Sequence, residues 1–333
     1  MNQDLQKQLA NKRILLIAPR FFGYEKALRE TMERHGALVD YWLDKPSNTL
    51  TTKALVRLRP TLVRAQMHAY VRRIASSTVP YDVVLIIKGE AFDKEAIRMM
   101  RHAWPDARFI YYTWDSFKNY PHLVPLLPLF DQAYSFDSAE CKSIPNLRHI
   151  PLFFVDKYRN LSTEQIEYDL CSIASVHSDR YPVIQRIKQA APSGSRSYEY
   201  YFYPSRRAFL ARKYLDRNFH APPIDAVQFQ PLAEDRLLDT LRKCKVVVDV
   251  QHPGQTGLTM RTLEMVGARK KLITTNPRVK EYDFYDPDNI LIVDRDNPAV
   301  PESFLASPYR RLPEEIYEKY SVVGWLSRLL SPD

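Results

Sequence analysis

The sequence predicts an α/β protein made of two Rossmann-like domains, and three observations lead to this fold class. Short apolar segments alternate with segments of helical spacing in both halves of the chain, which is typical of parallel sheets with helices on both faces. One such segment, Val246–Val248, is β-branched and does not alternate with polar residues, as expected of a strand covered on both sides. The length of 333 residues is enough for two domains of this kind.

The first half of the chain, residues 1–157, is expected to form one domain. Helices are expected at 25–35, closed by Gly36, and at 94–102, while 53–76 has helical spacing interrupted at Pro60. Neither a Gly-x-Gly-x-x-Gly pattern nor a Walker loop occurs in this half, so we do not expect it to bind a nucleotide. The expected strands lie at 13–19, 38–42, 81–88, 108–113, 133–136 and 149–153.

Two places in the first half could carry chemistry. Asp115 follows the strand 108–113, where catalytic carboxylates often lie, and it could equally cap the next turn through its side chain. Gly23 lies in the aromatic loop after the first strand. The rings around Gly23 could stack on a sugar or an isoprenoid, or they could simply cap the core.

The second half is expected to hold a domain at 158–312, after a polar linker at 155–167. Its first strand, 168–175, leads into a loop that contains His177, Ser178 and Arg180. Ser178 could cap the following helix, where Arg180 would oppose the helix dipole. An unfavourable cation at a helix start indicates an anionic partner such as a diphosphate, and the alternative is an exposed arginine without a partner.

Three further segments of the second half could contact a ligand. Phe229 would lie beside the base of a bound nucleotide, judged from its position alone. The helix at 206–217 mixes basic and aromatic residues, but no nucleic-acid motif accompanies it, so a solvated amphipathic helix is favoured over a nucleic-acid reader. The pairs Asp286/Asp288 and Asp294/Asp296 mimic metal-binding Asp-x-Asp motifs, although their setting favours turns and no metal site is expected.

The most informative stretch follows the strand at 246–250. Its loop contains Gly254, Thr256 and Gly257, and Thr259 is a plausible N-cap for a helix that starts near Met260. A helix N-terminus at the carboxyl edge of a parallel sheet is a place where α/β proteins bind phosphates.

Arg261 and Glu264 share one face of that helix because they are three residues apart. A guanidinium suits a phosphate and a carboxylate suits the hydroxyls of a ribose. The alternative is that both are ordinary solvated helix charges.

The pattern Gly257-x-Thr259-Met260-Arg261-x-x-Glu264, followed by Gly267 and Leu272-Ile273-Thr274, resembles the C-terminal motif of CgeB-like glycosyltransferases, a branch of the retaining group-1 GT-B enzymes. The resemblance implies two domains facing a cleft, with the acceptor held by the first and the C-terminal helix, within 313–333, crossing back to it. It also implies that Glu264 meets the ribose of a nucleotide sugar and that Arg261 lies near its phosphates. Related transferases carry an arginine near the position of Arg180, usually after a glycine, where this chain has Ala174-Ser175.

The activity implied by the resemblance is transfer of a sugar from a nucleotide sugar, used as co-substrate without other cofactor or metal. The acceptor would be a glycan or a lipid-linked sugar of bacterial surface polysaccharide biosynthesis, and the reaction would retain the anomeric configuration. If the enzyme inverts instead, Asp115 is the candidate general base.

Composition limits the compartment and the partners. Hydrophobic residues make up 45% and charged residues 26%, as in globular proteins, and no run reaches the roughly 18 apolar residues of a membrane span. Three cysteines without metal spacing and a polar N-terminus without a signal-peptide core predict a reduced, cytoplasmic protein. The formal charge of +9 fits nucleotide sugars, nucleic acid or an anionic membrane face, and the amphipathic tail at 313–333 could serve peripheral membrane association.

Two other classes of function stay open. A nucleotide-sugar epimerase or hydrolase on the same fold would need an acid/base pair that the sequence does not display. A non-catalytic module for nucleotide sugars or nucleic acid would rely on the basic helix for affinity, and nucleic-acid binding would weaken steeply with salt.

Overall fold

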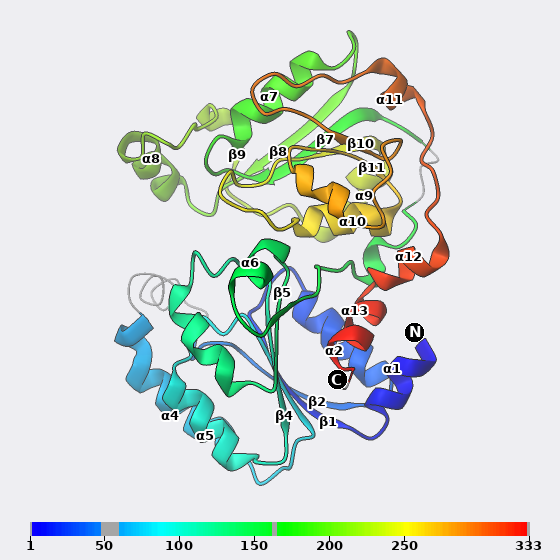
Figure 1. The fold of residues 1–333 in the computed structure, drawn as a ribbon. Coiled ribbons are helices and arrows are strands. Elements are labelled where there is room, and N and C mark those ends of the chain that lie inside the picture. The colour runs from blue at the N-terminus through cyan, green and yellow to red at the C-terminus, as the bar shows by residue number, and fades with distance from the viewer. Residues whose placement is uncertain (1, 48–59, 162–164, 332–333) are drawn as a thin grey trace. The chain divides into compact units, whose positions relative to one another are not determined.

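The computed structural model describes residues 2–47, 60–161 and 165–331, and the chain divides into two compact units. Unit 1 consists of Met1–Leu152 with Val322–Asp333, and unit 2 consists of Phe153–Ser321. Each unit is built on a six-stranded sheet (Figure 1). The predicted fold class, α/β with two Rossmann-like domains, is confirmed.

The sheet of unit 1 has the order β2-β1-β3-β4-β5-β6, and all neighbouring strands are parallel. Residues 150–153, expected as part of the last strand, lie beyond it, and the Ile150 carbonyl accepts a hydrogen bond from the Tyr112 hydroxyl at 3.1 Å instead. The strands are β1 (Arg13–Ile17), β2 (Leu38–Trp42), β3 (Val83–Ile87), β4 (Arg108–Thr113), β5 (Gln132–Ser135) and β6 (Leu147–His149).

Helices cover both faces of this sheet. In Figure 1, α4 and α5 lie side by side on one face, and α1, α2 and α13 lie on the other. Residues 53–59 of the helix expected at 53–76 lie outside the described residues. The helices of unit 1 are α1 (Asn2–Leu9), α2 (Tyr24–Arg34), α4 (Arg64–Ala75), α5 (Lys94–Ala103), α6 (Ser138–Ser143) and α13 (Val322–Leu329), with 3₁₀ helices η1 (Pro60–Val63) and η2 (Pro121–Leu129).

The sheet of unit 2 is also parallel and has the order β12-β11-β10-β7-β8-β9. The chain builds outward from β7 to β9, returns to β10 beside β7, and then builds outward on the other side. This is the strand order of dinucleotide-binding Rossmann domains, with a topological switch point between β7 and β10. The strands are β7 (Tyr168–Ser175), β8 (Ser197–Phe202), β9 (Val227–Gln228), β10 (Cys244–Asp249), β11 (Lys271–Thr274) and β12 (Ile290–Ile292).

The helices of unit 2 also occupy both faces of their sheet, with α7 and α11 on one side and α9 and α10 on the other (Figure 1). Helix α8 contributes Phe209 to the core and is otherwise largely exposed. The helices are α7 (Arg180–Ala190), α8 (Arg206–Leu215), α9 (Glu234–Arg242), α10 (Met260–Ala268), α11 (Glu302–Ala306) and α12 (Glu314–Lys319), with 3₁₀ helices η3 (Asp156–Tyr158), η4 (Ile224–Ala226) and η5 (Pro277–Glu281).

The segment that enters unit 2 is packed rather than loose. The Phe154 amide donates to the Tyr320 carbonyl at 2.9 Å, and Tyr158 is buried, so the stretch from 155 expected as a polar linker begins inside unit 2. Residues 162–164 of that stretch lie outside the described residues. The division between the units therefore falls at 152/153, whereas the sequence placed it at 157/158.

The tail does not form the single helix expected within 313–333. It forms α12 in unit 2 and α13 in unit 1, separated by Tyr320 and Ser321. Helix α13 returns to unit 1 and buries Trp325 against Tyr112, with ring centroids 4.8 Å apart. No helix in the described part of the chain is both long and apolar enough to cross a membrane.

Candidate functional site

The loops that follow β7 and β10 flank the switch point of unit 2, which is where open α/β sheets bind their ligands. The loop after β7 contains His177 and Ser178 and leads to Arg180, the first residue of α7, and the loop after β10 leads to the N-terminus of α10. The topology thus brings the segment around His177 and Arg180 and the segment from Gly254 to Glu264 to the same edge of one sheet.

The start of α10 is fixed by side chains from both ends of its loop. The Thr259 hydroxyl caps the helix by accepting from the Thr262 amide at 3.2 Å, as predicted. The buried carboxylate of Asp249, the last residue of β10, accepts hydrogen bonds from the hydroxyls of Thr259 and Thr262. The cap and the strand end together hold the amide groups of the first turn in a defined orientation at the sheet edge.

Arg261 and Glu264 are not solvated helix charges. Glu264 is 6% exposed, and its Oε2 lies 2.8 Å from Nη1 of Arg261. Burial, the largest single effect, lowers the pKa of Arg261, but the Glu264 carboxylate together with Tyr158 and Asp249 outweighs it and raises that pKa above its usual value. Burial, followed by the negative charge of Glu264, likewise raises the pKa of Tyr158, a residue of η3 that packs beside the pair.

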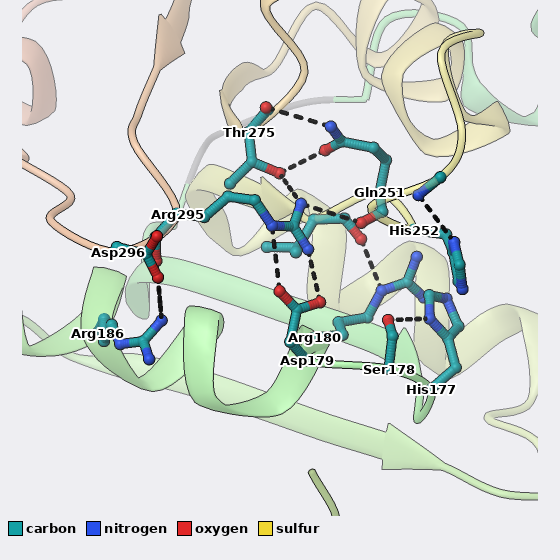
Figure 2. Close-up of polar contacts among 12 residues, drawn as sticks. His177, Ser178, Asp179, Arg180, Arg186, Gln251, His252, Thr275, Arg295 and Asp296 are labelled. Carbon is teal, nitrogen blue, oxygen red and sulfur yellow. Dashed lines mark hydrogen bonds and ion pairs between the residues drawn. The ribbon is translucent and has the colours of Figure 1, made fainter. Parts of the chain in front are cut away.

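Arg180 contacts backbone groups at the ends of two strands. Its Nε donates to the Val250 carbonyl at 2.6 Å and its Nη1 to the Ser175 carbonyl at 3.1 Å (Figure 2 shows the first of these bonds). The alternative interpretation of Arg180, an exposed arginine without a partner, is therefore wrong. Burial lowers the pKa of Arg180 to about 10, against the attraction of Asp249, and the charges of Arg261 and Arg295 lower it further.

Ser178 does not cap α7, because the capping position belongs to Asp179, whose side chain makes no capping hydrogen bond. Ser178 has a left-handed φ of 45°, and its hydroxyl lies 3.0 Å from Nδ1 of His177. Burial, followed by the charge of Arg180, lowers the pKa of His177 to about 3. The imidazole is thus neutral at physiological pH, and its ring lies 5.4 Å from that of His252, between centroids.

Arg295 joins the loops at this edge, a role that the sequence did not indicate. Its guanidinium forms a two-pronged ion pair with Asp179, and its Nη1 also donates to the Gln251 carbonyl at 3.2 Å and to the Thr275 hydroxyl at 3.0 Å. Figure 2 shows these contacts converging on one guanidinium. The loops after β7, β10, β11 and β12 are therefore held together by one side chain.

The loop after β10, which contains Gly254 and Gly257, is shaped by hydrogen bonds rather than by unusual glycine conformations. Left-handed φ values occur at four described glycines, and Gly254 and Gly257 are not among them. The side-chain amide of Asn276 donates to the carbonyls of Thr256 and Gly257, both at 3.3 Å. The backbone amide of Gly254 donates to Nδ1 of His252 at 3.1 Å. The loop is thus fastened to the end of β11.

Phe229 packs against the core cluster of unit 2, and its predicted place beside a nucleotide base stays a prediction. It is partly buried, and its ring centroid lies 6.0 Å from that of Phe209. Its position in the sequence could not show which way the ring points.

The Asp-x-Asp segments form turns, as their setting indicated. The carboxylate of Asp286 accepts from the Asp288 amide at 2.9 Å, and that of Asp294 accepts from the amides of Asp296 and Asn297 at 2.8 Å. These are the short-range hydrogen bonds that aspartate makes in turns.

In unit 1, Asp115 follows β4 and is ion-paired with Lys88 at 2.8 Å. Lys88, which follows β3, also lies 3.2 Å from Glu90 and 4.9 Å from the centre of the Tyr120 ring. Asp115 does not cap a turn through its carboxylate as the alternative interpretation held, since the Thr113 hydroxyl makes the local contacts there. In the aromatic loop beside Gly23, Phe22 is 66% exposed.

Comparisons with solved structures identify the architecture. The structure of HepE from Anabaena in complex with UDP and glucose matches with a TM-score of 0.54 and 12% identity, over 96% of this chain and 98% of that chain. The fold is GT-B. A UDP-glucosyltransferase from Polygonum tinctorium (TM-score 0.46, 10% identity, 97% and 95% coverage) and MurG of Acinetobacter baumannii (0.43, 10%, 96% and 93%) align less well and carry no further argument.

The GT-B assignment describes the architecture and does not by itself assign an activity, because the identity to HepE is low. No protein-family model matches the sequence, and no curated protein matches it. Apart from Phe229, the residues of unit 2 that the sequence motifs indicate lie in the loops after β7 and β10 or in the helices α7 and α10.

Proposed function

We propose that this protein is a glycosyltransferase that takes a sugar from a nucleoside-diphosphate sugar. The observation that carries the proposal is the convergence of Arg180, Arg261 and Arg295 at the switch point of unit 2, beside the N-terminus of α10. Besides burial, the charges of Arg261 and Arg295 both act on Arg180 and lower its pKa, so a nearby diphosphate would relieve this repulsion. The GT-B fold shared with HepE, which was solved with UDP and glucose, supports the same conclusion.

The diphosphate would lie against the amides of the first turn of α10 and the guanidinium groups of Arg180 and Arg261. Glu264 would accept hydrogen bonds from the ribose hydroxyls, since a carboxylate has two acceptor oxygens with several lone-pair sites. The ion pair between them fixes both side chains before the donor arrives, which reduces the entropy lost on binding. His177, Ser178, Gly254, Thr256, Gly257 and Thr259 would form the walls of this donor site.

The reaction would proceed with retention and without a metal. The bond between the anomeric carbon and the diphosphate oxygen breaks, a bond to the acceptor oxygen forms on the same face, and the departing diphosphate takes the acceptor proton. Arginines and helix amides would stabilise the charge that develops on the leaving group. A glycan or lipid-linked sugar of surface polysaccharide biosynthesis would be the acceptor, in the cytoplasm or at the inner membrane face.

The test is a thermal-shift measurement with UDP, GDP and ADP in buffer containing EDTA. A ligand that binds only the folded state at a hundred times its dissociation constant adds about 2.7 kcal/mol of stability, so one nucleotide should raise the melting temperature clearly. Arg180→Gln should abolish the rise, while Arg207→Gln, on the exposed face of α8, should preserve it. Absence of any nucleotide effect in the wild-type protein would refute the proposal, and a requirement for Mg²⁺ or Mn²⁺ would refute its metal-free form.

A further inference from the structure

A second cavity of about 710 Å³ lies at the opposite edge of the unit 2 sheet from the donor site. Lys245 and Lys271, which line it, belong to the beginnings of β10 and β11, whereas Asp249, beside α10, ends β10. At about 3.3 Å per strand residue, Lys245 and Asp249 are roughly 13 Å apart along the strand. The cavity is therefore separate from the switch point.

The walls of this cavity are strongly basic. Among the described residues that line it, five are cationic and none is Asp or Glu. Two of these cations have carboxylate partners outside the lining, Lys245 with Asp169 at 3.0 Å and Arg269 with Glu314 at 3.0 Å. The cationic residues are Lys245, Arg269, Lys270, Lys271 and Arg311.

Two of the ammonium groups are buried without a counter-charge. Lys270 is 3% exposed and Lys271 is 4% exposed, and no described carboxylate lies within ion-pair distance of either Nζ. Lys270 donates to the carbonyls of Arg242 and Cys244, and Lys271 donates to those of Phe304 and Ser307. Neutral carbonyls satisfy the hydrogen bonds but do not neutralise two buried positive charges. Burial accordingly lowers the pKa of Lys270 to about 8.

We propose that this basic cavity is a second binding site, for a soluble phosphate-bearing molecule of metabolite size. The volume lies in the range of small-molecule pockets, and the positive walls, in which no described Asp or Glu takes part, select an anion with more than one negative charge. Leu305 and Tyr309, which also line the cavity, provide apolar surface for an organic portion of the ligand. The proposal concerns a site distinct from the donor site and does not depend on the glycosyltransferase assignment.

The test is calorimetric titration of inorganic pyrophosphate into protein held in excess UDP, so that a donor site, if present, is already filled. The variant Lys245→Gln/Arg311→Gln removes two cations of the cavity. Both side chains are accessible, and Asp169, the partner of Lys245, retains its hydrogen bond from the Arg196 amide at 2.9 Å. The matched control, Arg206→Gln/Arg207→Gln, removes two exposed charges from α8 in the same unit.

We expect the wild-type protein and the control to bind pyrophosphate equally, and the cavity variant to bind it about tenfold more weakly, because charged hydrogen bonds are lost. Because UDP is itself a soluble phosphate-bearing molecule, the titration is repeated without it. No pyrophosphate binding in either titration, or equal weakening in the control, would overturn the proposal by showing no site or only a response to net charge. Sedimentation with phosphatidylglycerol vesicles separates the two sources of phosphate. Vesicle binding that depends on Lys245 and Arg311 without pyrophosphate binding would overturn the assignment to a soluble ligand.

Discussion

Glu264 is the residue whose proposed role can be measured most directly. If it accepts hydrogen bonds from the ribose, Glu264→Gln should weaken binding of the nucleoside diphosphate, because one charged hydrogen bond contributes roughly 1.5–3 kcal/mol. This corresponds to a loss of about tenfold to a hundredfold in affinity. Calorimetry with the nucleotide that stabilises the wild-type protein measures it.

The substitution also breaks an ion pair with Arg261, so the control must do the same elsewhere in unit 2. Glu318→Gln is suitable, because Glu318 forms a two-pronged ion pair with Arg159, with Nη2 and Oε2 at 2.9 Å. It should reduce stability and leave nucleotide affinity unchanged. Equal affinity in folded Glu264→Gln and Glu318→Gln proteins would remove Glu264 from the binding site.

We expect Asp44 to make the free energy of unfolding of unit 1 depend on pH. Its side chain is fully buried, no described residue donates a hydrogen bond to its oxygens, and Nζ of Lys45 lies 3.5 Å from Oδ1. Burial raises the pKa of Asp44 to about 6, against the attraction of Lys45. Between pH 4 and 6 the folded state therefore binds the proton more tightly than the unfolded state, and this group lowers the free energy of unfolding as pH rises.

Asp44→Asn should flatten that part of the pH profile, whereas Asp106→Asn, at an exposed position of the same unit, should not. Urea denaturation at pH 4.5, 5.5 and 6.5, followed by tryptophan fluorescence, reports on unit 1, which contains Trp42, Trp104, Trp114 and Trp325. Identical profiles for the two variants would contradict the assignment to Asp44.

At the scale of elements, α10 depends on a glycine because of how closely it approaches the entry segment of unit 2. A Cβ atom at Gly267 would lie 2.5 Å from Cγ of Phe154, whose ring is held by Tyr317 at 4.9 Å between centroids. Gly267→Ala should therefore cost about 1–3 kcal/mol in stability through overpacking.

Gly254→Ala is the matched control, because a Cβ there meets nothing closer than Nδ1 of His252 at 3.5 Å. It should change stability by no more than about 0.5 kcal/mol. Thermal denaturation followed by circular dichroism compares the two variants without relying on tryptophans, which all lie in unit 1. A Gly267→Ala protein as stable as Gly254→Ala would show that Phe154 can move away.

Elements were predictable from the sequence where local pattern and burial agree. β3, β4 and β10 are apolar because both faces are covered, and Thr259 precedes α10 as a capping residue does, so both features were visible as patterns. Contacts between loops were not visible. Arg295 bonds to residues 20, 44 and 116 positions away, and within Asp294-Arg295-Asp296 it looked like part of a turn.

The sequence also could not show toward which part of the structure a side chain or helix is buried. Phe229 follows a strand of two residues, too short to define an inward face, and its ring packs against the core. The break between α12 and α13 was also hidden, because the apolar residues on either side of Tyr320 continue one amphipathic pattern although they pack into different units.

At the scale of the whole molecule, the open chemical question is stereochemistry, and it decides the role of Asp115. In the proposed retaining reaction the leaving diphosphate accepts the proton, and Asp115 is held by Lys88 at 2.8 Å rather than left available as a base. Asp115→Asn should then reduce the rate only modestly. If the enzyme inverts, loss of a general base should cost on the order of 10²–10⁴ in rate.

Proton NMR of the freshly formed product, compared with the donor, gives the anomeric configuration directly. Arg101→Gln is a control for Asp115→Asn, because it breaks the ion pair of Arg101 with Asp131 at 2.8 Å, in the same unit. We expect a retained configuration, with both variants active. An inverted product together with an inactive Asp115→Asn protein would make Asp115 the catalytic base. The role of Lys88 would then be to position that base rather than to neutralise a carboxylate that takes no part in the reaction.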